Sequence, residues 1–404
     1  MADILKGNAV VGQSGGPTAV INQSLVGVIH AVGGFDAIDV LYGARNGVRG
    51  IINDQFLPLN DLDRERLERV AATPAAALGS TRDKPDEQYC REILDVFARR
   101  GVRYFFYIGG NDSADTALIV NDLARASGYD LRVFHIPKTI DNDLRVTDHC
   151  PGYGSAARFV ASALIGDDRD NASLAGVKID VIMGRNAGWL TASGMLARQD
   201  ETDGPHLIYV PERRVSQDQF VDDVAEVYGR LGRCLVAVSE GVEDTDGMPW
   251  GEKLASTVER DSHGNVQLSG SGALGDYLAG LVKTKVSQRL GGKALRVRAD
   301  TFGYLQRSFA GYASPVDQRE ARLVGKTAVR FAMRGYADGS VALKRKAGEK
   351  YGVTCFRAEL TDVARETKSL PAEYINDRGN GINESFRAYA SPLAGKLPVI
   401  GRLR

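Results

Sequence analysis

The feature that most constrains the fold is a repeated succession of short apolar runs, polar turns and helical stripes. The apolar run 8–11 is followed by a glycine turn at 15–16 and by a helical stripe of apolar residues over 21–32. The same elements recur further along the chain, where a helical stripe of apolar residues at 90–97 is followed by the apolar run 102–108. This succession predicts an α/β fold with doubly wound, mostly parallel sheets and flanking helices.

Later segments extend the pattern. Further buried strands are predicted where short apolar runs end in polar loops, at 133–136, 177–183, 207–210 and 235–238. Ser216 and Gln219 have the spacing of a capping box and predict a helix start. Ser314 and Pro315 predict another, and Gly335 ends it.

Length and composition allow more than one folded lobe, because the chain has 404 residues and 43% hydrophobic content. We expect a larger α/β lobe at 1–204, a smaller α/β lobe at 205–335 and a C-terminal extension at 336–404 packed on the lobes. The polar, glycine-rich stretch 243–273 is interpreted as an excursion with a hairpin around 263–265.

Charge and cysteine usage exclude several classes. Lys plus Arg and Asp plus Glu both number 51, so no net field attracts nucleic acid or an anionic membrane. Cys90, Cys150, Cys234 and Cys355 show no C-x-x-C spacing, so reduced thiols and no zinc are expected. The start MADILKGNAV lacks a signal-peptide pattern and a spanning stretch, so the cytoplasm is the expected compartment.

Three polar turns follow predicted strands: QSGGP at 13–17, GGNDS at 109–113 and PKTIDND at 137–143. Glycines such as Gly15 and Gly16 let backbone N–H groups approach phosphate oxygens, and a helix start favours an anion. A glycine pair after a strand can also be only a tight turn. The three turns together favour a phosphate-binding site.

The PKTIDND turn places Lys138 close to Asp141 and Asp143. In a phosphoryl-transfer site one carboxylate could accept a hydroxyl proton, while the lysine compensates the charge of the migrating group and Mg²⁺ completes the arrangement. A solvated turn is the alternative interpretation of two such carboxylates.

Four arginines in loop or strand-end contexts could hold a sugar phosphate: Arg82, Arg185, Arg298 and Arg307. For any one of them, a surface ion pair is the alternative. Glu240 follows an apolar strand and could bond sugar hydroxyls or cap a turn.

The motifs GGNDS, PKTIDND, MGRNAGW, SEG and YLQR, in this order, resemble the 6-phosphofructokinases over roughly residues 8–330. The resemblance implies a phosphofructokinase-like fold and phosphorylation of fructose 6-phosphate at its 1-hydroxyl, a step of glycolysis or gluconeogenesis. It also implies Mg²⁺ as cofactor. It makes Asp141 the base, with Lys138 and Asp112 in the catalytic set.

The resemblance also implies binding residues. Thr139 and Asp143 would assist substrate and metal binding, and Arg298 would reach a neighbouring subunit, which implies a homo-oligomer, either dimer or tetramer. The sugar-phosphate residues would be Met183, Gly184, Arg185, Glu240, Tyr304 and Arg307. The diphosphate residues would be Gly15, Gly16 and Arg82.

Donor choice follows from two departures. ATP-using members of the family carry the motifs G-G-D-G-S and P-G-T-I-D-N-D. This chain has Asp112 in place of the third glycine of the first motif and Lys138 in place of the glycine of the second. A carboxylate at 112 would repel the α-phosphate of ATP, and Lys138 would add charge for a small polyanion. The resemblance therefore implies pyrophosphate as donor, in a reversible reaction.

Asn111 stands where the family commonly has a metal-binding aspartate. An amide is a poorer Mg²⁺ ligand, so the charge could come from Asp112, Asp141 or Asp143. No allosteric arginine set is recognised, so weak or absent nucleotide regulation is expected.

Three alternatives remain open. The chain could use ATP, or phosphorylate another ketose phosphate such as sedoheptulose 7-phosphate. It could also be a non-catalytic regulatory subunit, although such a protein needs no base at Asp141.

Overall fold

The computed structural model describes four stretches of the chain: 4–251, 272–348, 350–364 and 366–403. The hairpin predicted around 263–265 lies outside them. The chain divides into two compact units. Unit 1 comprises Met1–Ser155 and Arg307–Lys368, and unit 2 comprises Ala156–Gln306 and Ser369–Arg404.

This division differs from the expected boundaries at 204 and 335. The first passage between units falls near the start of a long helix, and the chain returns to unit 1 at Arg307. The segment 336–404 is not a separate extension, because its first part adds strands to unit 1 and its last part belongs to unit 2. Patterns read along the chain could not show this return, because it depends on contacts between distant segments.

Unit 1 is built on a seven-stranded sheet with the order β11-β10-β5-β4-β1-β2-β3. Its five inner strands are parallel, and only the edge strands β3 and β11 run antiparallel to their neighbours. The strands are β1 (Gly7–Gln13), β2 (Ile38–Ala44), β3 (Phe56–Pro58), β4 (Val102–Gly109), β5 (Arg132–Pro137), β10 (Asp338–Arg345) and β11 (Val353–Ala358).

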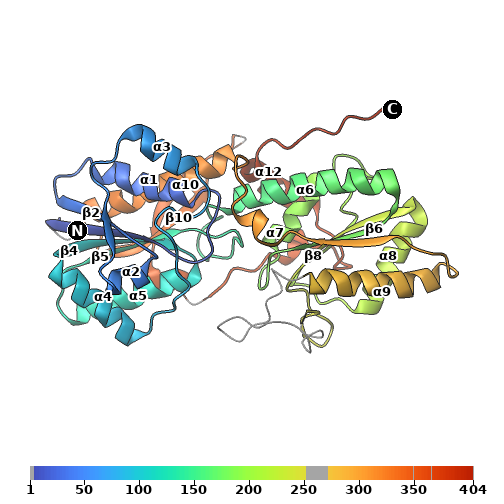
Figure 1. The fold of residues 1–404 in the computed structure, drawn as a ribbon, viewed down its shortest axis with the longest axis horizontal. Coiled ribbons are helices and arrows are strands. Elements are labelled where there is room, and N and C mark those ends of the chain that lie inside the picture. Colours follow the sequence, from blue (N-terminus) through green and yellow to red (C-terminus); the bar gives the residue numbers. More distant parts are fainter. Residues whose placement is uncertain (1–3, 252–271, 349, 365, 404) are drawn as a thin grey trace. The chain divides into compact units, whose positions relative to one another are not determined.

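Helices cover both faces of this sheet (Figure 1), and each face has its own apolar core. One face carries α1 (Ile21–Val32), α3 (Arg64–Ala72) and α10 (Pro315–Met333). The other carries α2 (Val48–Ile52), α4 (Glu87–Arg99), α5 (Asn111–Ala126) and α11 (Leu360–Val363). The predicted doubly wound α/β fold is confirmed.

Unit 2 has a four-stranded sheet, entirely parallel, with the order β7-β8-β6-β9. The strands are β6 (Gly176–Ile182), β7 (Leu207–Tyr209), β8 (Arg233–Ser239) and β9 (Val297–Thr301). Helices α8 (Gln217–Leu231) and α9 (Ala273–Arg289) pack on one face, and α6 (Tyr153–Leu174) lies on the other (Figure 1). The shorter elements are α7 (Trp189–Ala192), η1 (Ser193–Ala197), η3 (Gly303–Arg307), η4 (Ala372–Tyr374) and α12 (Glu384–Ala394).

Two predicted helix starts are only partly confirmed. The Ser216 side chain accepts from the Gln219 backbone N–H, as a cap should, but the Gln219 side chain donates to the Arg378 carbonyl instead of completing the box. Ser314 occupies the N-cap position of α10 without a side-chain hydrogen bond to the helix start.

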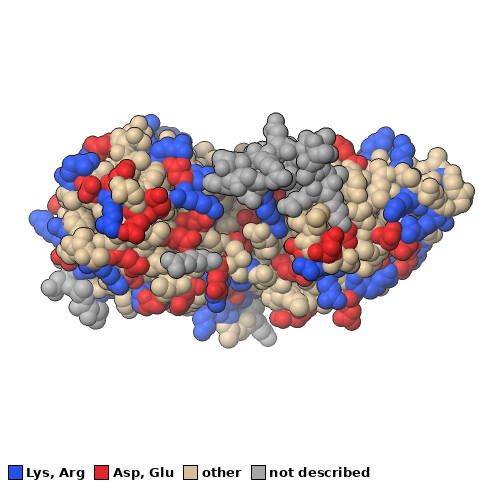
Figure 2. Space-filling view, turned by 90° about the horizontal axis from the view of Figure 1, so that it is seen from below, with Lys and Arg blue, Asp and Glu red and all other residues tan. Residues whose placement is uncertain are grey.

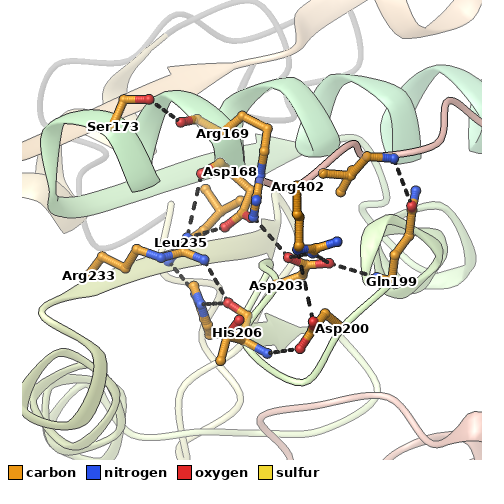
Figure 3. Close-up of polar contacts among 12 residues, drawn as sticks. Asp168, Arg169, Ser173, Gln199, Asp200, Asp203, His206, Arg233, Leu235 and Arg402 are labelled. Carbon is orange, nitrogen blue, oxygen red and sulfur yellow. Dashed lines mark hydrogen bonds and ion pairs between the residues drawn. The ribbon is translucent and has the colours of Figure 1, made fainter. Parts of the chain in front are cut away.

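The C-terminal segment is tied to unit 2 by charge (Figure 3). Arg402 donates to both carboxylate oxygens of Asp203, at 2.6 and 2.7 Å, and Arg169 donates to the same carboxylate at 2.9 Å. Asp168, buried beside them, pairs with Arg169 and Arg233. Each buried carboxylate of this network is therefore matched by two guanidinium groups.

The surface is of mixed charge. Figure 2 shows acidic and basic side chains interspersed over one face, in keeping with the equal numbers of basic and acidic residues, 51 each. None of the described helices is long and apolar enough to span a bilayer.

Helices α1 and α10 of unit 1 pack closely where each has a glycine facing the other helix. A Cβ on Gly325 would lie 2.1 Å from the Ser24 carbonyl oxygen, and one on Gly27 would lie 2.4 Å from that of Arg322. Gly325 begins the Gly-Lys-Thr triplet of the predicted helix 314–335. Its place in the middle of α10 shows a packing role.

We predict that Gly325→Ala lowers the free energy of unfolding by about 1–3 kcal/mol, because the new methyl group forces the two helices apart. Denaturant unfolding measures the change. The matched control is Gly229→Ala in α8, where a Cβ meets no atom within 4 Å. At that exposed helical position, alanine should raise the free energy of unfolding by about 0.5–1 kcal/mol. Equal effects at both positions would contradict the packing argument.

Candidate active site

Three loops of unit 1 lie together because they leave the carboxyl ends of the adjacent parallel strands β1, β4 and β5. The Ser14 N–H donates to the Ile108 carbonyl at 2.9 Å, and the Lys138 N–H donates to the Gly109 carbonyl at 2.9 Å. The Ser14 and Ser113 hydroxyls are 2.8 Å apart. The turns QSGGP, GGNDS and PKTIDND therefore form one connected surface.

Cationic side chains border the glycine turn at Gly15 and Gly16. A Cβ on Gly15 would lie 3.1 Å from Lys138 Nζ, and one on Gly16 would lie 3.3 Å from Arg307 Cζ. Gly15 also has a φ of +75°, which side chains rarely adopt. The absence of side chains therefore leaves backbone and two cations facing the same space, as binding of a phosphate requires.

Lys138 is the most constrained of these cations. Its side chain is 3% exposed, and its Nζ donates to the Gly16 carbonyl at 2.7 Å. Burial and, after it, the nearby charge of Arg307 lower the pKa of Lys138 to about 8, although the charges of Asp141 and Asp143 act in the opposite direction. An anion bound at the turn would favour the charged ammonium.

The two carboxylates of PKTIDND lie in different surroundings. The Asp141 backbone N–H donates to Thr139 Oγ1 at 3.0 Å, so Thr139 shapes the turn. Asp143 accepts from Asn111 Nδ2 at 2.9 Å. Burial, followed by the charge of Asp141, raises the pKa of Asp143 to about 7. A cation bound at this turn would keep both groups ionised.

The residues present fit a hard divalent cation. Asn111 Oδ1 is buried and has no hydrogen-bond partner among the described residues, while its Nδ2 is held by Asp143. Amide and carboxylate oxygens are the ligands that Mg²⁺ prefers. The departure at Asn111 therefore leaves an oxygen available, and Asp112, Asp141 or Asp143 would supply the negative charge.

Asp112 lies in the first turn of α5, where a carboxylate also complements the helix dipole. It is exposed and pairs with Lys84 at 3.1 Å. Arg82 is close enough to Lys138 to contribute to its electrostatic surroundings. The lysine partner of Asp112 was not predicted from the sequence, although it lies two residues after Arg82.

Lys368 is a second residue that sequence reasoning missed. Its backbone N–H donates to the Asp143 carbonyl at 2.7 Å, and its Nζ donates to the carbonyls of Thr147 and Asp148. It comes from the C-terminal stretch to which no mechanistic role was assigned. No motif marks it, because its position depends on the late return of the chain to unit 1.

The GSTR segment also supports the glycine turn. Ser80 Oγ donates to the Gly15 carbonyl at 2.6 Å, and the Gly15 N–H donates to the Thr81 carbonyl at 2.9 Å. The sequence singled out Arg82 in this segment but not its two neighbours.

In unit 2, the ends of β6 and β8 bring two sets of predicted sugar-binding residues together. The Glu240 N–H donates to the Ile182 carbonyl at 2.9 Å, and Ser239 Oγ donates to the Gly184 carbonyl. A Cβ on Gly241 would lie 1.9 Å from the Arg185 carbonyl. The MGR loop at 183–185 and the SEG turn therefore lie side by side.

Two other residues predicted to bind substrate, Arg298 and Tyr304, lie elsewhere in unit 2. Arg298 lies within edge strand β9 as the register partner of Lys178, and not beside the MGR loop. Tyr304 is 52% exposed in η3. In the same turn, Gln306 Oε1 accepts from the Met183 N–H at 3.3 Å, which joins η3 to the MGR loop.

A glycine turn bordered by the buried Lys138 ammonium and the half-buried Arg307 guanidinium, next to two carboxylates and an available amide oxygen, is typical of phosphoryl-transfer proteins. The pattern that defines the phosphofructokinase family matches residues 8–332. The chain belongs to this family.

Relatives and solved structures agree with this membership. The chain is 53% identical over 402 residues to the pyrophosphate--fructose 6-phosphate 1-phosphotransferase of Rhodospirillum rubrum, covering 99% of this chain and 98% of that one. It is 33% identical to a sulfofructose kinase of Alkalicoccus urumqiensis, over 91% of this chain and 92% of that one. The crystal structure of a pyrophosphate-dependent phosphofructokinase from Marinobacter aquaeolei matches with a TM-score of 0.84 at 33% identity, over 98% and 94% of the two chains.

We predict that Asp143→Asn stabilises the metal-free protein at pH 8 and that this gain shrinks as the pH falls. The folded state raises the pKa of Asp143 from 3.8 to about 7, so it holds a proton that the unfolded chain releases above about pH 4. The stability of the wild type therefore falls as the pH rises from about 4 to about 7, and asparagine removes that loss.

Denaturant unfolding from pH 5 to pH 8 with EDTA measures this effect. Asp112→Asn is the matched control, because it makes the same chemical change at an exposed carboxylate. A gain for Asp143→Asn that is the same at every pH would contradict the burial argument.

Proposed function

We propose that the protein transfers a phosphoryl group from pyrophosphate to the 1-hydroxyl of fructose 6-phosphate, giving phosphate and fructose 1,6-bisphosphate. The observation that carries the proposal is the glycine turn of unit 1, which faces Lys138 Nζ and the Arg307 guanidinium. The 53% identity to a protein with the corresponding name supports it.

Asp141 acts as the base. Its carboxylate accepts the proton of the 1-hydroxyl as that oxygen bonds to the transferred phosphorus, and the bond from phosphorus to the leaving phosphate breaks. Lys138, held by the Gly16 carbonyl, stabilises the negative charge on the migrating group and on the leaving phosphate. The bond broken in pyrophosphate and the bond formed in the product are of comparable free energy, so we expect the reaction to be reversible.

Mg²⁺ is the proposed cofactor. Asn111 Oδ1 with Asp143 would hold it, and when bound it would neutralise charge on the phosphate oxygens. The available oxygen of Asn111 supports this choice.

Pyrophosphate is the proposed donor for two reasons. The buried ammonium of Lys138 replaces part of the binding energy that adenosine contacts would supply. The carboxylate of Asp112, next to the GG turn, repels the additional phosphate of ATP. Gly15, Gly16 and Arg82 are assigned to the diphosphate.

Fructose 6-phosphate is assigned to the remaining predicted residues: Met183, Gly184, Arg185, Glu240, Tyr304 and Arg307, with Thr139 and Asp143. The adjacent MGR and SEG turns of unit 2 support this assignment. Arg298, away from the MGR loop on an edge strand, remains proposed for a neighbouring subunit of a dimer or tetramer.

We predict that exchanging both donor-determining residues, Asp112→Gly with Lys138→Gly, changes the choice of donor. The wild type should turn over with pyrophosphate and not with ATP. The double variant should lose about 100-fold or more in kcat/KM for pyrophosphate, because it lacks the positioned cation, while its relative activity with ATP rises. Steady-state assays with fructose 6-phosphate and Mg²⁺ at matched donor concentrations measure both values.

Two controls sharpen this test. Lys84→Ala removes the partner of Asp112 but leaves its charge, so the preference for pyrophosphate should remain. Asp141→Ala should reduce turnover about 100-fold or more, which excludes a contaminating kinase and a non-catalytic regulatory subunit. A donor choice that is unchanged in the double variant would contradict the roles of Asp112 and Lys138.

A further inference from the structure

Three aspartates of unit 2 converge where α6 meets the sheet. Asp167 comes from α6, Asp180 from β6 and Asp300 from β9. One carboxylate oxygen from each lies within 4.8 Å of the others. All three belong to unit 2, and none has a role in the proposed reaction.

Asp180 lacks a hydrogen-bond partner among the described residues. It is 0% exposed, and within the described part of the chain neither of its carboxylate oxygens has a hydrogen-bond partner. Asp167 Oδ2 is likewise buried without a partner among the described residues, although the same carboxylate pairs with Lys178 through Oδ1. An unsatisfied buried carboxylate is costly and requires a compensating group.

Figure 3 shows that other buried carboxylates of unit 2 are paired with arginine side chains. Asp168, the next residue along α6, and Asp203 each pair with two arginine side chains. Asp180 is as deeply buried as these two. Among the described residues, however, Asp180 lacks the direct pairing with guanidinium groups that Asp168 and Asp203 have.

Strand register places like charges side by side. Asp180 and Asp300 are direct partners in the parallel pair β6 and β9. Opposed like charges destabilise a sheet unless a cation lies between them. Lys178 supplies one positive charge, with its Nζ 3.6 Å from Asp300. When all three carboxylates are ionised, this one ammonium leaves two negative charges unbalanced.

We propose that Asp167, Asp180 and Asp300 bind a hard divalent cation of the Ca²⁺ or Mg²⁺ type. A divalent ion balances the two remaining charges, and carboxylate oxygens are its preferred ligands. Oxygens on opposite sides of Ca²⁺ are about 4.6–5.2 Å apart, so separations within 4.8 Å fit a shared ion. The complete burial of Asp180 favours a small ion over the guanidinium of a second copy of this chain.

The ion would join α6 to two strands that lead toward predicted sugar-binding residues. β6 ends directly before the MGR loop at 183–185, and β9 ends before the turn 303–307. The site therefore stabilises unit 2 and is separate from the reaction chemistry.

The test uses the full-length protein, stripped with EDTA and titrated with Ca²⁺ alone, without pyrophosphate or sugar. Calorimetry gives the number of bound ions, and thermal unfolding gives the shift in Tm. The variant is Asp180→Asn. The matched control is Asp170→Asn, which removes a carboxylate on the same helix, 3.7 Å from Lys178 but outside the three ligands.

The proposal expects the wild type and Asp170→Asn to bind one more Ca²⁺ than Asp180→Asn, or to bind it more than about 10-fold more tightly. It also expects the Ca²⁺-dependent rise in Tm to be lost in Asp180→Asn. Equal stoichiometry, affinity and Tm shift in all three proteins would overturn it, whether Asp180 holds a proton or meets a partner's cation. If Asp180→Asn does not fold, Asp300→Asn at an exposed position gives the same two readouts.

Discussion

The candidate active site of unit 1 depends on one buried cation, the ammonium of Lys138, and on the hydrogen bond that it donates to the Gly16 carbonyl. That bond joins the PKTIDND turn to the glycine turn after β1. The same ammonium lies among Asp141, Asp143, Arg82 and Arg307, which act on its pKa with opposite signs. Its burial makes the site incomplete in charge until an anion binds. The functions proposed for the three loops, the carboxylates and the available oxygen of Asn111 all depend on the position of this ammonium.

Much of the fold could be predicted from the sequence, because its signals are local. The apolar runs at 102–108 and 177–183 became β4 and β6 nearly residue for residue, since a buried parallel strand needs a continuous apolar run. The loops at their ends were recognisable from glycine pairs and clustered charges. That the QSGGP, GGNDS and PKTIDND turns meet follows from the strand order of the structure, in which β1, β4 and β5 are neighbours and their carboxyl ends share one edge.

What the sequence could not show depends on contacts between distant segments. The return of the chain at Arg307 divides the protein differently from the expected lobes, and it brings Lys368 to the backbone of Asp143. No periodicity encodes such a return. The missing partner of Asp180 was equally hidden, because an aspartate in an apolar run has the same appearance whether its carboxylate is paired or not. The roles assigned to the site residues, Arg298 and Tyr304 included, stay predictions.

The central claim is that this site exchanges phosphoryl groups with pyrophosphate and not with a nucleotide. The most direct measurement is the reverse reaction, followed by phosphorus NMR on purified protein with fructose 1,6-bisphosphate, inorganic phosphate and Mg²⁺. The account predicts that a pyrophosphate resonance appears and grows to an equilibrium level. No pyrophosphate with inorganic phosphate, together with formation of ATP when ADP replaces it, would contradict the account.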